Sequence, residues 1–506
     1  MNMTDDVKAI KYNSRFGLIN KLVVTLIQFA TRVVLVYFLG SFVLGISGLF
    51  TNVVSIFGLA DLGLNTAIVY MYYDPLAKGD IAALKKLTYL FQKVYYLIFF
   101  VVVLLGVIIM PFIQNIVNEP NSKYSVLEIQ IYFILTVLNV AFSYLMVYKT
   151  SLLFADNRAY ITYNVNSIVQ IVFFMLQIVG LFIWKNYAIF LTTIIFMNLI
   201  SNFISSLYAE NRYPWLRERQ KIKFSFETDI RPILKITFSA IIYKISGIFL
   251  NSTDNIIISI VISTTVVGMY TNYLLISNAL ILLVTVIFSA YTPSIGKILA
   301  SKDEKHDLEK TFYDLQEKSG IVSIFVVTLF AVGANYFIKI WMGSAFVMNT
   351  FTVLMLSINL YLATGFQPIW VFREAAALYK ILQWRMLWAA IINIPISILL
   401  AKLFGVGGVV LGSVIARLLT YYLYEPIVIS TQIIHSKISK YFITLLVNFT
   451  VTLAISIIAQ YVGGIILANL SPVYQLFISW GTTFVIDCIV ICFIYGNPIS
   501  KFVGKN

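Results

Sequence analysis

A series of long apolar runs is the feature that most constrains how this chain can fold. Each run exceeds the roughly 18 residues that a helix needs to cross a hydrocarbon core of about 30 Å. Strands of a transmembrane barrel would instead alternate polar and apolar residues over about ten positions. The runs therefore predict an all-α polytopic membrane protein. Fourteen transmembrane helices are expected, at residues 16–39, 43–72, 90–114, 127–153, 161–184, 187–208, 233–262, 267–295, 320–342, 348–372, 381–402, 407–432, 441–467 and 472–495.

The placement of basic residues predicts the topology. Charged residues make up 11% of the chain, against about 25% in soluble proteins, yet the net charge is +14. With a cytoplasmic N-terminus, nearly all Lys and Arg outside the runs fall on the cytoplasmic side. Those on the other side are Lys123, Lys185, Lys339 and Lys402. This asymmetry predicts that both termini are cytoplasmic, with anionic lipids rather than nucleic acid as partners.

An internal repeat suggests how the helices are grouped. The sequence GLFTN at 48–52 returns as GMYTN at 268–272, and 90–113 aligns without gaps with 315–338. Each repeat would hold six spans, so the halves would be pseudo-symmetric about an axis along the membrane normal. The predicted domains are an N-terminal six-helix lobe at 1–209, a basic cytoplasmic linker at 210–232, a C-terminal six-helix lobe at 233–435, and two additional helices with a cytoplasmic tail at 436–506.

Several charged residues lie inside the predicted spans, where each costs about 2.5–3.5 kcal/mol on insertion scales. One interpretation is that they neutralise each other in structural ion pairs between helices. Lys244 and Asp254 cannot pair with each other, because ten residues separate them by about 15 Å along one helix. If the first and seventh spans face each other, these two residues line a central cavity together with Arg32 and Asp61. The polar cluster around Asp254, NSTDN at 251–255, is expected to soften its helix.

A second group of charges lies on the twelfth span. Arg417, Tyr421 and Glu425 are spaced four apart, which places them on one side of a helix. Their role is left open. Asp487 lies in the last span, outside the repeat, and is set aside as a packing residue.

No catalytic or metal-binding pattern accompanies these charges. His306 and His435 have no metal-ligand partner nearby, and Cys488 and Cys492 are read as ordinary apolar residues. A Gly-x-x-x-x-Gly-Lys loop for ATP is absent from the sequence. The predicted outward loops are too short to hold a catalytic domain. Transport without a chemical step is therefore favoured, with no enzyme activity, metal or cofactor expected.

Three stretches carry a resemblance to a known family. They are YFLGSFVLGISGLFTNVVSIFGLADLGLNTAIVY (37–70), DNIIISIVISTTVVGMYTNYLLI (254–276) and YTPSIGKILA (291–300). In this order, and with the internal repeat, they closely resemble the polysaccharide transporter family. These are the Wzx-type flippases of the multidrug/oligosaccharidyl-lipid/polysaccharide exporter superfamily. The resemblance covers essentially residues 10–435.

The resemblance implies two six-helix lobes in the bacterial plasma membrane that open alternately to each side. It implies translocation of undecaprenyl-pyrophosphate-linked oligosaccharide repeat units from the inner to the outer leaflet, for capsule or exopolysaccharide, alongside polysaccharide polymerase and glycosyltransferases. In that setting Arg32 and Lys244 would bind the pyrophosphate or acidic sugars. Asp61 matches the family's Asp-Leu-Gly and Asp254 its aspartate in the seventh span, and both are assigned to gating or ion coupling.

Three alternatives remain open. A cation-coupled multidrug exporter of the same superfamily would be expected to have a negatively charged cavity, whereas the four central charges here balance. A lipid II flippase fits the span count, but the motifs favour it less. A non-transporting membrane scaffold of a polysaccharide synthase would tolerate alanine at Arg32 or Lys244. The sugar composition of the substrate and the energy source do not follow from the sequence.

Overall fold

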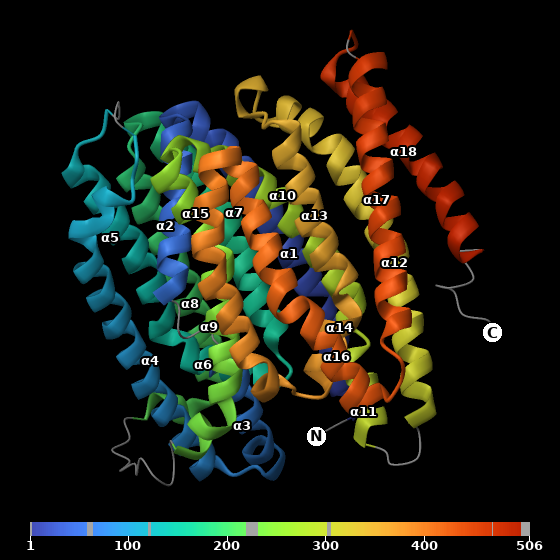
Figure 1. Cartoon of the computed structure of the whole chain (residues 1–506). Helices are drawn as coiled ribbons and strands as arrows, with labels where there is room; N and C mark the ends of the chain where they lie inside the picture. Colours follow the sequence, from blue (N-terminus) through green and yellow to red (C-terminus); the bar gives the residue numbers. More distant parts are fainter. Residues whose placement is uncertain are drawn as a thin grey trace. The chain divides into compact units, whose positions relative to one another are not determined.

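The computed structural model describes residues 3–57, 64–119, 123–218, 231–300, 305–467 and 469–496. All regular secondary structure in these ranges is helical (Figure 1), and eleven helical segments are long and apolar enough to cross a membrane. A multi-pass all-α membrane protein is thus confirmed, whereas the count of fourteen spans stays a prediction. Part of the predicted span 43–72 lies at 58–63, outside the described residues.

The chain forms two compact units, Met1–Gly268 and Met269–Asn506. The helices of the first unit are α1 (Met3–Leu39), α2 (Ser41–Phe57), α3 (Leu64–Lys78), α4 (Ile81–Ile109), η2 (Met110–Asn115), α5 (Val126–Ser143), η3 (Tyr144–Met146), α6 (Val147–Ala155), α7 (Ala159–Trp184), α8 (Tyr187–Arg212), η4 (Pro214–Arg217) and α9 (Arg231–Val261). The first turns of α10 (Thr264–Ser289) also belong to this unit.

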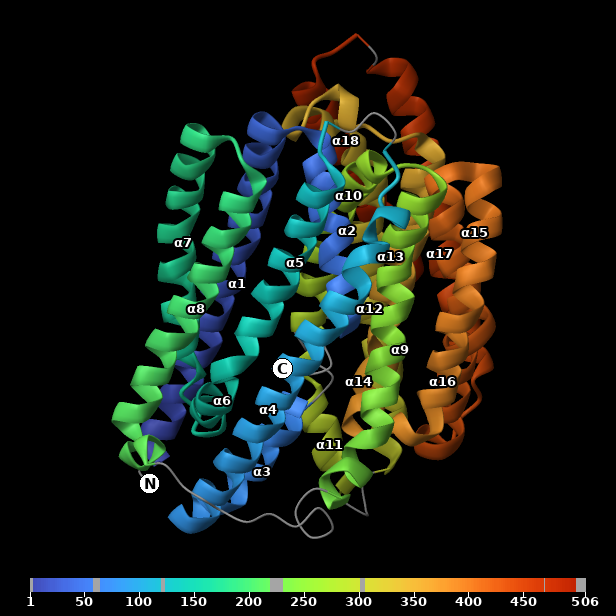
Figure 2. The same cartoon turned by 90° about the vertical axis from the view of Figure 1, so that its left-hand side faces the viewer.

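Polar caps and interhelical hydrogen bonds order the first unit. Helix α5 begins with a capping box, in which the Glu128 amide donates to the Ser125 hydroxyl and the Ser125 amide donates to the Glu128 carboxylate. Helix α1 packs on α7, which packs on α8, and Figure 2 shows these three helices side by side. The Asn20 amide of α1 donates to the Ser167 hydroxyl of α7 over 2.9 Å. Such bonds join helices inside a bilayer, where burial of apolar surface cannot.

The second unit contains the rest of α10 and the helices α11 (Thr292–Ala300), α12 (Lys305–Trp341), η6 (Ser344–Phe346), α13 (Thr350–Gly365), α14 (Gln367–Ala375), α15 (Tyr379–Arg417), η7 (Leu418–Tyr422), α16 (Leu423–Ile429), η8 (Ser430–Ile434), α17 (Ser439–Ile466) and α18 (Pro472–Tyr495). Helix α12 packs on α13, α17 and α18, and Figure 1 shows α12, α17 and α18 together.

Helix α15 contains the predicted boundary between the spans at 381–402 and 407–432. Gly405 has φ 60° and ψ −140°, a conformation that interrupts the helix with a kink. Only glycine adopts this region without strain. The chain turns back at Gly405, because the Ser397 hydroxyl donates to the Val409 carbonyl over 3.2 Å and the Ser413 hydroxyl donates to the Asn393 side-chain oxygen over 3.0 Å. Further along, η7 and η8 are π-helical. The two predicted spans are therefore two helices that pack against each other on either side of Gly405.

The division into compact units differs from the predicted division into lobes. Helix α9 follows the predicted linker at 210–232 but belongs to the first unit, because it packs mainly against α2. Only beyond Gly268 does the chain join the second unit. The lobes at 1–209 and 233–435, which follow from the internal repeat, stay a prediction.

Candidate functional site

The polar cluster of α9 is buried against α2. Ser252, Asp254 and Asn255 are 4%, 6% and 1% exposed. The hydroxyls of Ser252 and Ser55 lie 2.9 Å apart, which ties α9 to α2. Helix α9 is α-helical through this cluster, and the expected softening stays a prediction. The cluster faces protein rather than lipid.

Asn255 is the member of this cluster with unused hydrogen-bonding capacity. Among the described residues, neither its amide oxygen nor its amide nitrogen has a hydrogen-bond partner, although both are buried. A buried amide without partners carries a desolvation cost of about 1–3 kcal/mol. The unused donor and acceptor give α9 a polar group that a ligand or a water molecule can satisfy.

Lys244 lies ten residues before Asp254 on the same helix and is partly buried. Within the described part of the chain, its ammonium forms neither an ion pair nor a hydrogen bond. A cation at membrane depth is normally paired or faces a polar space. The role of Lys244 in binding an anionic ligand stays a prediction.

The other two predicted cavity residues, Arg32 and Asp61, come from other parts of the chain than α9. Arg32 is partly buried in the last quarter of α1, a helix that packs mainly on α7 and on α2. Helix α2 also packs on α9, so α1 and α9 share a neighbour. Asp61 lies outside the described residues. A common cavity lined by these four charges stays a prediction.

The turn between α9 and α10 is fastened to the segment after η2 through Glu119. One carboxylate oxygen of Glu119, Oε2, accepts hydrogen bonds from the Ser263 hydroxyl, the Thr265 hydroxyl and the Thr265 amide over 2.9, 2.8 and 3.3 Å. The backbone amide of Asn118 donates to the Thr264 hydroxyl over 2.9 Å. Hydrogen bonds to a charged acceptor are the stronger kind. We name these residues, Asn118, Glu119, Ser263, Thr264 and Thr265, the Glu119 junction.

Two glycines bring backbones together beside the Glu119 junction. A Cβ atom on Gly45 of α2 would collide with the Thr264 carbonyl, and one on Gly268 of α10 would lie 2.9 Å from the Gly45 nitrogen. Real Cβ atoms essentially never approach so closely. Small residues allow this kind of contact between membrane helices. Together with the junction, the two glycines close this end of the α2, α9 and α10 cluster.

Charged residues gather where α6 and α8 end in the first unit. Lys149 pairs with Glu210 over 2.6 Å, and Asp156 accepts from the Arg158 guanidinium over 2.9 Å. Tyr213 donates to the same Asp156 carboxylate over 2.5 Å. Burial, and next the hydrogen bond to Asp156, raise the pKa of the Tyr213 phenol. The positive-inside pattern predicts that these residues lie on the cytoplasmic side.

In the second unit, Arg417 and Glu425 are paired with residues of α13 and α14. Arg417 donates to the Asn359 amide oxygen over 2.7 Å, and Arg373 donates to the Glu425 carboxylate over 3.1 Å. Between these bonds, the rings of Tyr421 and Phe366 lie 6.1 Å apart. The stripe predicted at 417, 421 and 425 therefore faces α13 and α14, although π-helical turns change its spacing.

The Arg373–Glu425 ion pair is buried, with side chains 8% and 0% exposed. Sequence reasoning missed Arg373, because it lies just beyond the predicted end of a span at 372. Its position one residue past an apolar run was the only signal in the sequence. Both partners belong to the second compact unit. The pair matches the interpretation of intramembrane charges as structural ion pairs.

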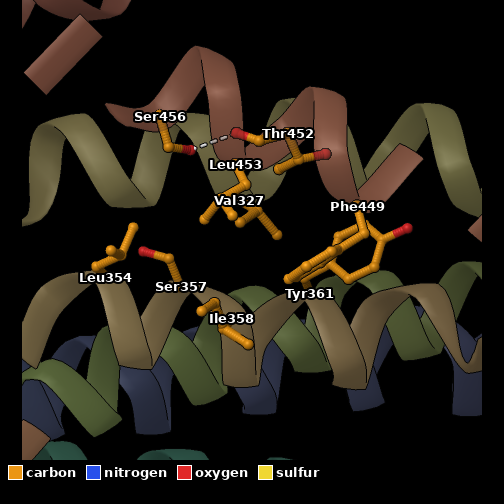
Figure 3. Close-up of a pocket in the computed structure, with 9 residues that line it drawn as sticks. All are labelled: Val327, Leu354, Ser357, Ile358, Tyr361, Phe449, Thr452, Leu453 and Ser456. Atoms are coloured by element: carbon orange, nitrogen blue, oxygen red, sulfur yellow. Dashed lines mark hydrogen bonds between the residues drawn. The ribbon is translucent and has the colours of Figure 1, made fainter. Parts of the chain in front are cut away.

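A small pocket lies between α12, α13 and α17 (Figure 3). Val327, Ile358 and Leu453 line it together with the hydroxyl-bearing Ser357, Thr452 and Ser456. The Ser456 hydroxyl donates to the Thr452 carbonyl within α17 over 2.7 Å, the dashed line in Figure 3. The cavity volume is about 10 Å³, room for about one water molecule. It is too small to hold a substrate in this conformation.

Solved structures with the same fold are transporters. The chain resembles the lipid II flippase MurJ in an inward closed conformation, with a TM-score of 0.67, 15% identity, and coverage of 94% of this chain and 98% of that one. It also resembles an inward-facing MATE multidrug resistance transporter of the MOP superfamily, with a TM-score of 0.57, 17% identity, and coverage of 80% and 94%. A Vibrio cholerae MATE transporter gives a TM-score of 0.53, 13% identity, and coverage of 86% and 100%.

At these identities the likeness shows the fold. No curated protein sequence matches the chain. The helical architecture is that of a multi-pass membrane protein with the fold of these transporters. The sequence profile described as "Polysaccharide biosynthesis protein" matches residues 13–299, more than half of the chain. The chain therefore belongs to this polysaccharide biosynthesis family, as its resemblance to Wzx-type flippases predicted.

Proposed function

We propose that this protein is a flippase for undecaprenyl-pyrophosphate-linked oligosaccharide repeat units. It moves them from the inner to the outer leaflet of the bacterial plasma membrane by alternating access, for assembly of a capsule or exopolysaccharide. Both termini lie in the cytoplasm. The protein performs no chemical step on its substrate and needs no metal or cofactor. Polysaccharide polymerase and glycosyltransferases are its partners in the pathway.

The proposal rests mainly on the environment of Lys244. A partly buried ammonium without a partner among the described residues needs an anion to offset the cost of its place in the membrane. A pyrophosphate or an acidic sugar supplies one. Lys244 would not bind a cationic drug of the kind exported by multidrug transporters, because two like charges repel in a medium of low dielectric constant.

The other residues of the site have supporting roles in this proposal. Arg32 adds a second cation for the substrate. Asp254, buried beside the unpartnered amide of Asn255, and Asp61 act in gating or ion coupling. Arg417 and Glu425 hold the second unit together through Asn359 and Arg373. The Glu119 junction closes the end of the cluster that the positive-inside pattern assigns to the outside.

Two other functions found in the same superfamily remain candidates, flipping of lipid II and export of drugs. A lipid II flippase is favoured by the broader structural likeness to MurJ, at 94% coverage and a TM-score of 0.67. A multidrug exporter is favoured by the likeness to MATE transporters, at lower TM-scores. Lipid II also carries a pyrophosphate, so Lys244 separates both lipid substrates from cationic drugs but not from each other.

The test is a transport assay in proteoliposomes with three fluorescent substrates: an undecaprenyl-pyrophosphate-linked oligosaccharide, lipid II and a cationic drug. The proposal expects the first to cross fastest. Lys244→Gln, which removes the charge, should slow its movement at least tenfold. Lys402→Gln is the matched control, because Lys402 is exposed on α15.

The other outcomes of the transport assay distinguish the alternative functions. Transport of the drug alone would support the multidrug alternative, and faster movement of lipid II would support the lipid II alternative. No movement of any substrate by well-folded protein would favour the scaffold alternative. Equal transport by wild type and Lys244→Gln would remove the observation on which the proposal rests.

A further inference from the structure

A buried carboxylate in the second unit lies outside the site described above. Asp487 of α18 is 0% exposed, and α18 packs against α12 and α17. Its oxygen Oδ2 lies 2.7 Å from the hydroxyl oxygen of Thr328 on α12. Its other oxygen, Oδ1, is buried and has no hydrogen-bond partner among the described residues. An ionised carboxylate accepts hydrogen bonds at both oxygens, so this environment is poor for the charged form.

Among the described residues, Asp487 forms no ion pair. Helix α18 contains no Lys, Arg or His, and α17 carries its lysine, Lys440, in its first turn. On α12 the lysines nearest to Thr328 are Lys318 and Lys339, both about 15 Å away along the helix. Other titratable groups along these helices include Glu317 and Tyr336 on α12, Tyr461 on α17, and Tyr474, Cys488, Cys492 and Tyr495 on α18.

The hydrogen bonds of Thr328 show where a proton is needed. Its hydroxyl oxygen lies 2.8 Å from the Ile324 carbonyl and 2.7 Å from Asp487 Oδ2. A hydroxyl has a single hydrogen and can donate it to only one of these oxygens. The second contact therefore needs a hydrogen from the other side. Of the two partners, the backbone carbonyl has none, so Asp487 is the one that supplies it.

We infer that Asp487 is a proton-binding site, held as a neutral carboxylic acid that donates to Thr328. Thr328 in turn donates to the Ile324 carbonyl, so each hydrogen in the chain has an acceptor. Loss of the proton leaves a buried negative charge between α12 and α18. The next turn of this interface is apolar, with Ile324, Ile321 and Ile491 in one buried cluster. Deprotonation therefore weakens the packing of α18 on α12.

The surroundings of Thr483 also support a protonated Asp487. It lies one turn before Asp487 on α18, is fully buried, and its hydroxyl has no hydrogen-bond partner in the described part of the chain. No donor from this turn reaches Asp487. Two other polar side chains bind backbone instead: Trp480 of α18 donates to the Leu329 carbonyl, and Gln460 of α17 donates to the Ala331 carbonyl of α12.

Infrared spectroscopy of the purified full chain tests the inference directly. At pH 7 the wild type should show the carbonyl band of a protonated carboxylic acid, and Asp487→Asn should lack it. Asp314→Asn is the matched control, because Asp314 is 43% exposed and paired with Lys318, and it should retain the band. Thr328→Val removes the acceptor of the proton and should shift the band. Absence of the band in wild type, or a band unchanged in both Asp487→Asn and Thr328→Val, would overturn the inference.

The dependence of stability on pH provides a second readout. The folded chain holds one proton that the unfolded Asp487 releases above about pH 4, so the wild type should lose stability as pH rises. Relative to Asp487→Asn, its folded-to-unfolded ratio should fall about tenfold per pH unit until the folded state also loses the proton. Parallel curves for the two proteins would contradict the inference. So would a stabilisation of wild type, but not of Asp487→Asn, by NaCl over choline chloride, because it would show a sodium ion in place of the proton.

Discussion

The buried ion pair between Arg373 and Glu425 allows the sharpest prediction on stability. Glu425 is fully buried and Arg373 is 8% exposed at the side chain, with 3.1 Å between the paired atoms. Removing one partner of such a pair leaves an uncompensated buried charge, which costs about 3–5 kcal/mol. A second carboxylate, Glu374, lies 3.9 Å from Arg373 and is half exposed. It offsets part of the loss, so the lower end of the range is expected.

Four variants separate the charge from the packing. Glu425→Ala should cost about 3 kcal/mol. Glu425→Gln keeps an acceptor and should lose about 1.5–3 kcal/mol, the contribution of a hydrogen bond to a charged group. The double variant Arg373→Met with Glu425→Leu removes both charges and should return close to wild-type stability. Glu374→Gln is the matched control and should change stability by less than about 1 kcal/mol, as expected for an exposed pair.

Chemical denaturation in detergent, followed by tryptophan fluorescence, measures these differences. The reasoning requires the single variants at Glu425 to be less stable than both the control and the double variant. If Glu425→Gln were as stable as wild type, the charge at 425 would not be needed. If the double variant were as unstable as Glu425→Ala, the loss would come from packing rather than from an unpaired charge.

The closed end of the α2, α9 and α10 cluster gives two further predictions. Gly45→Val should cost about 1–3 kcal/mol by overpacking against the Thr264 carbonyl, whereas Gly464→Val, which meets nothing within 4 Å, should cost less in the same thermal unfolding assay. Glu119→Ala should speed amide hydrogen exchange at Thr265, whose amide donates to Glu119, and a rate unchanged from wild type would show that the junction does not hold this turn.

Much of the fold could be predicted because membrane helices follow from composition alone. The apolar runs marked the helices, and Gly405 lies where two predicted spans meet. The π-helical turns η7 and η8 could not be foreseen, because such turns depend on packing rather than on hydropathy. The place of α9 in the first unit depends on long-range contacts with α2, and no local pattern encodes such contacts.

The site was predicted only in part. The sequence pointed to the polar cluster of α9, and the structure buries Asp254 there. The partners of the charges were not predictable, because helix rotation and tilt decide which side chains meet. Glu425 is bound by Arg373, a residue counted as part of a loop. Asp487 was set aside as a packing residue, and its importance became visible only through Thr328, whose contact crosses two helices distant in sequence.

The central claim is that the protein moves a lipid-linked oligosaccharide across the membrane and that Lys244 binds its anionic group. The most direct test measures transbilayer movement of a fluorescent undecaprenyl-pyrophosphate-linked oligosaccharide in proteoliposomes, for wild type, Lys244→Gln and the control Lys402→Gln. The account predicts movement by wild type and by the control, and at least a tenfold slower rate for Lys244→Gln. Movement by wild type and Lys244→Gln at the same rate, or no movement by correctly folded wild type, would contradict it.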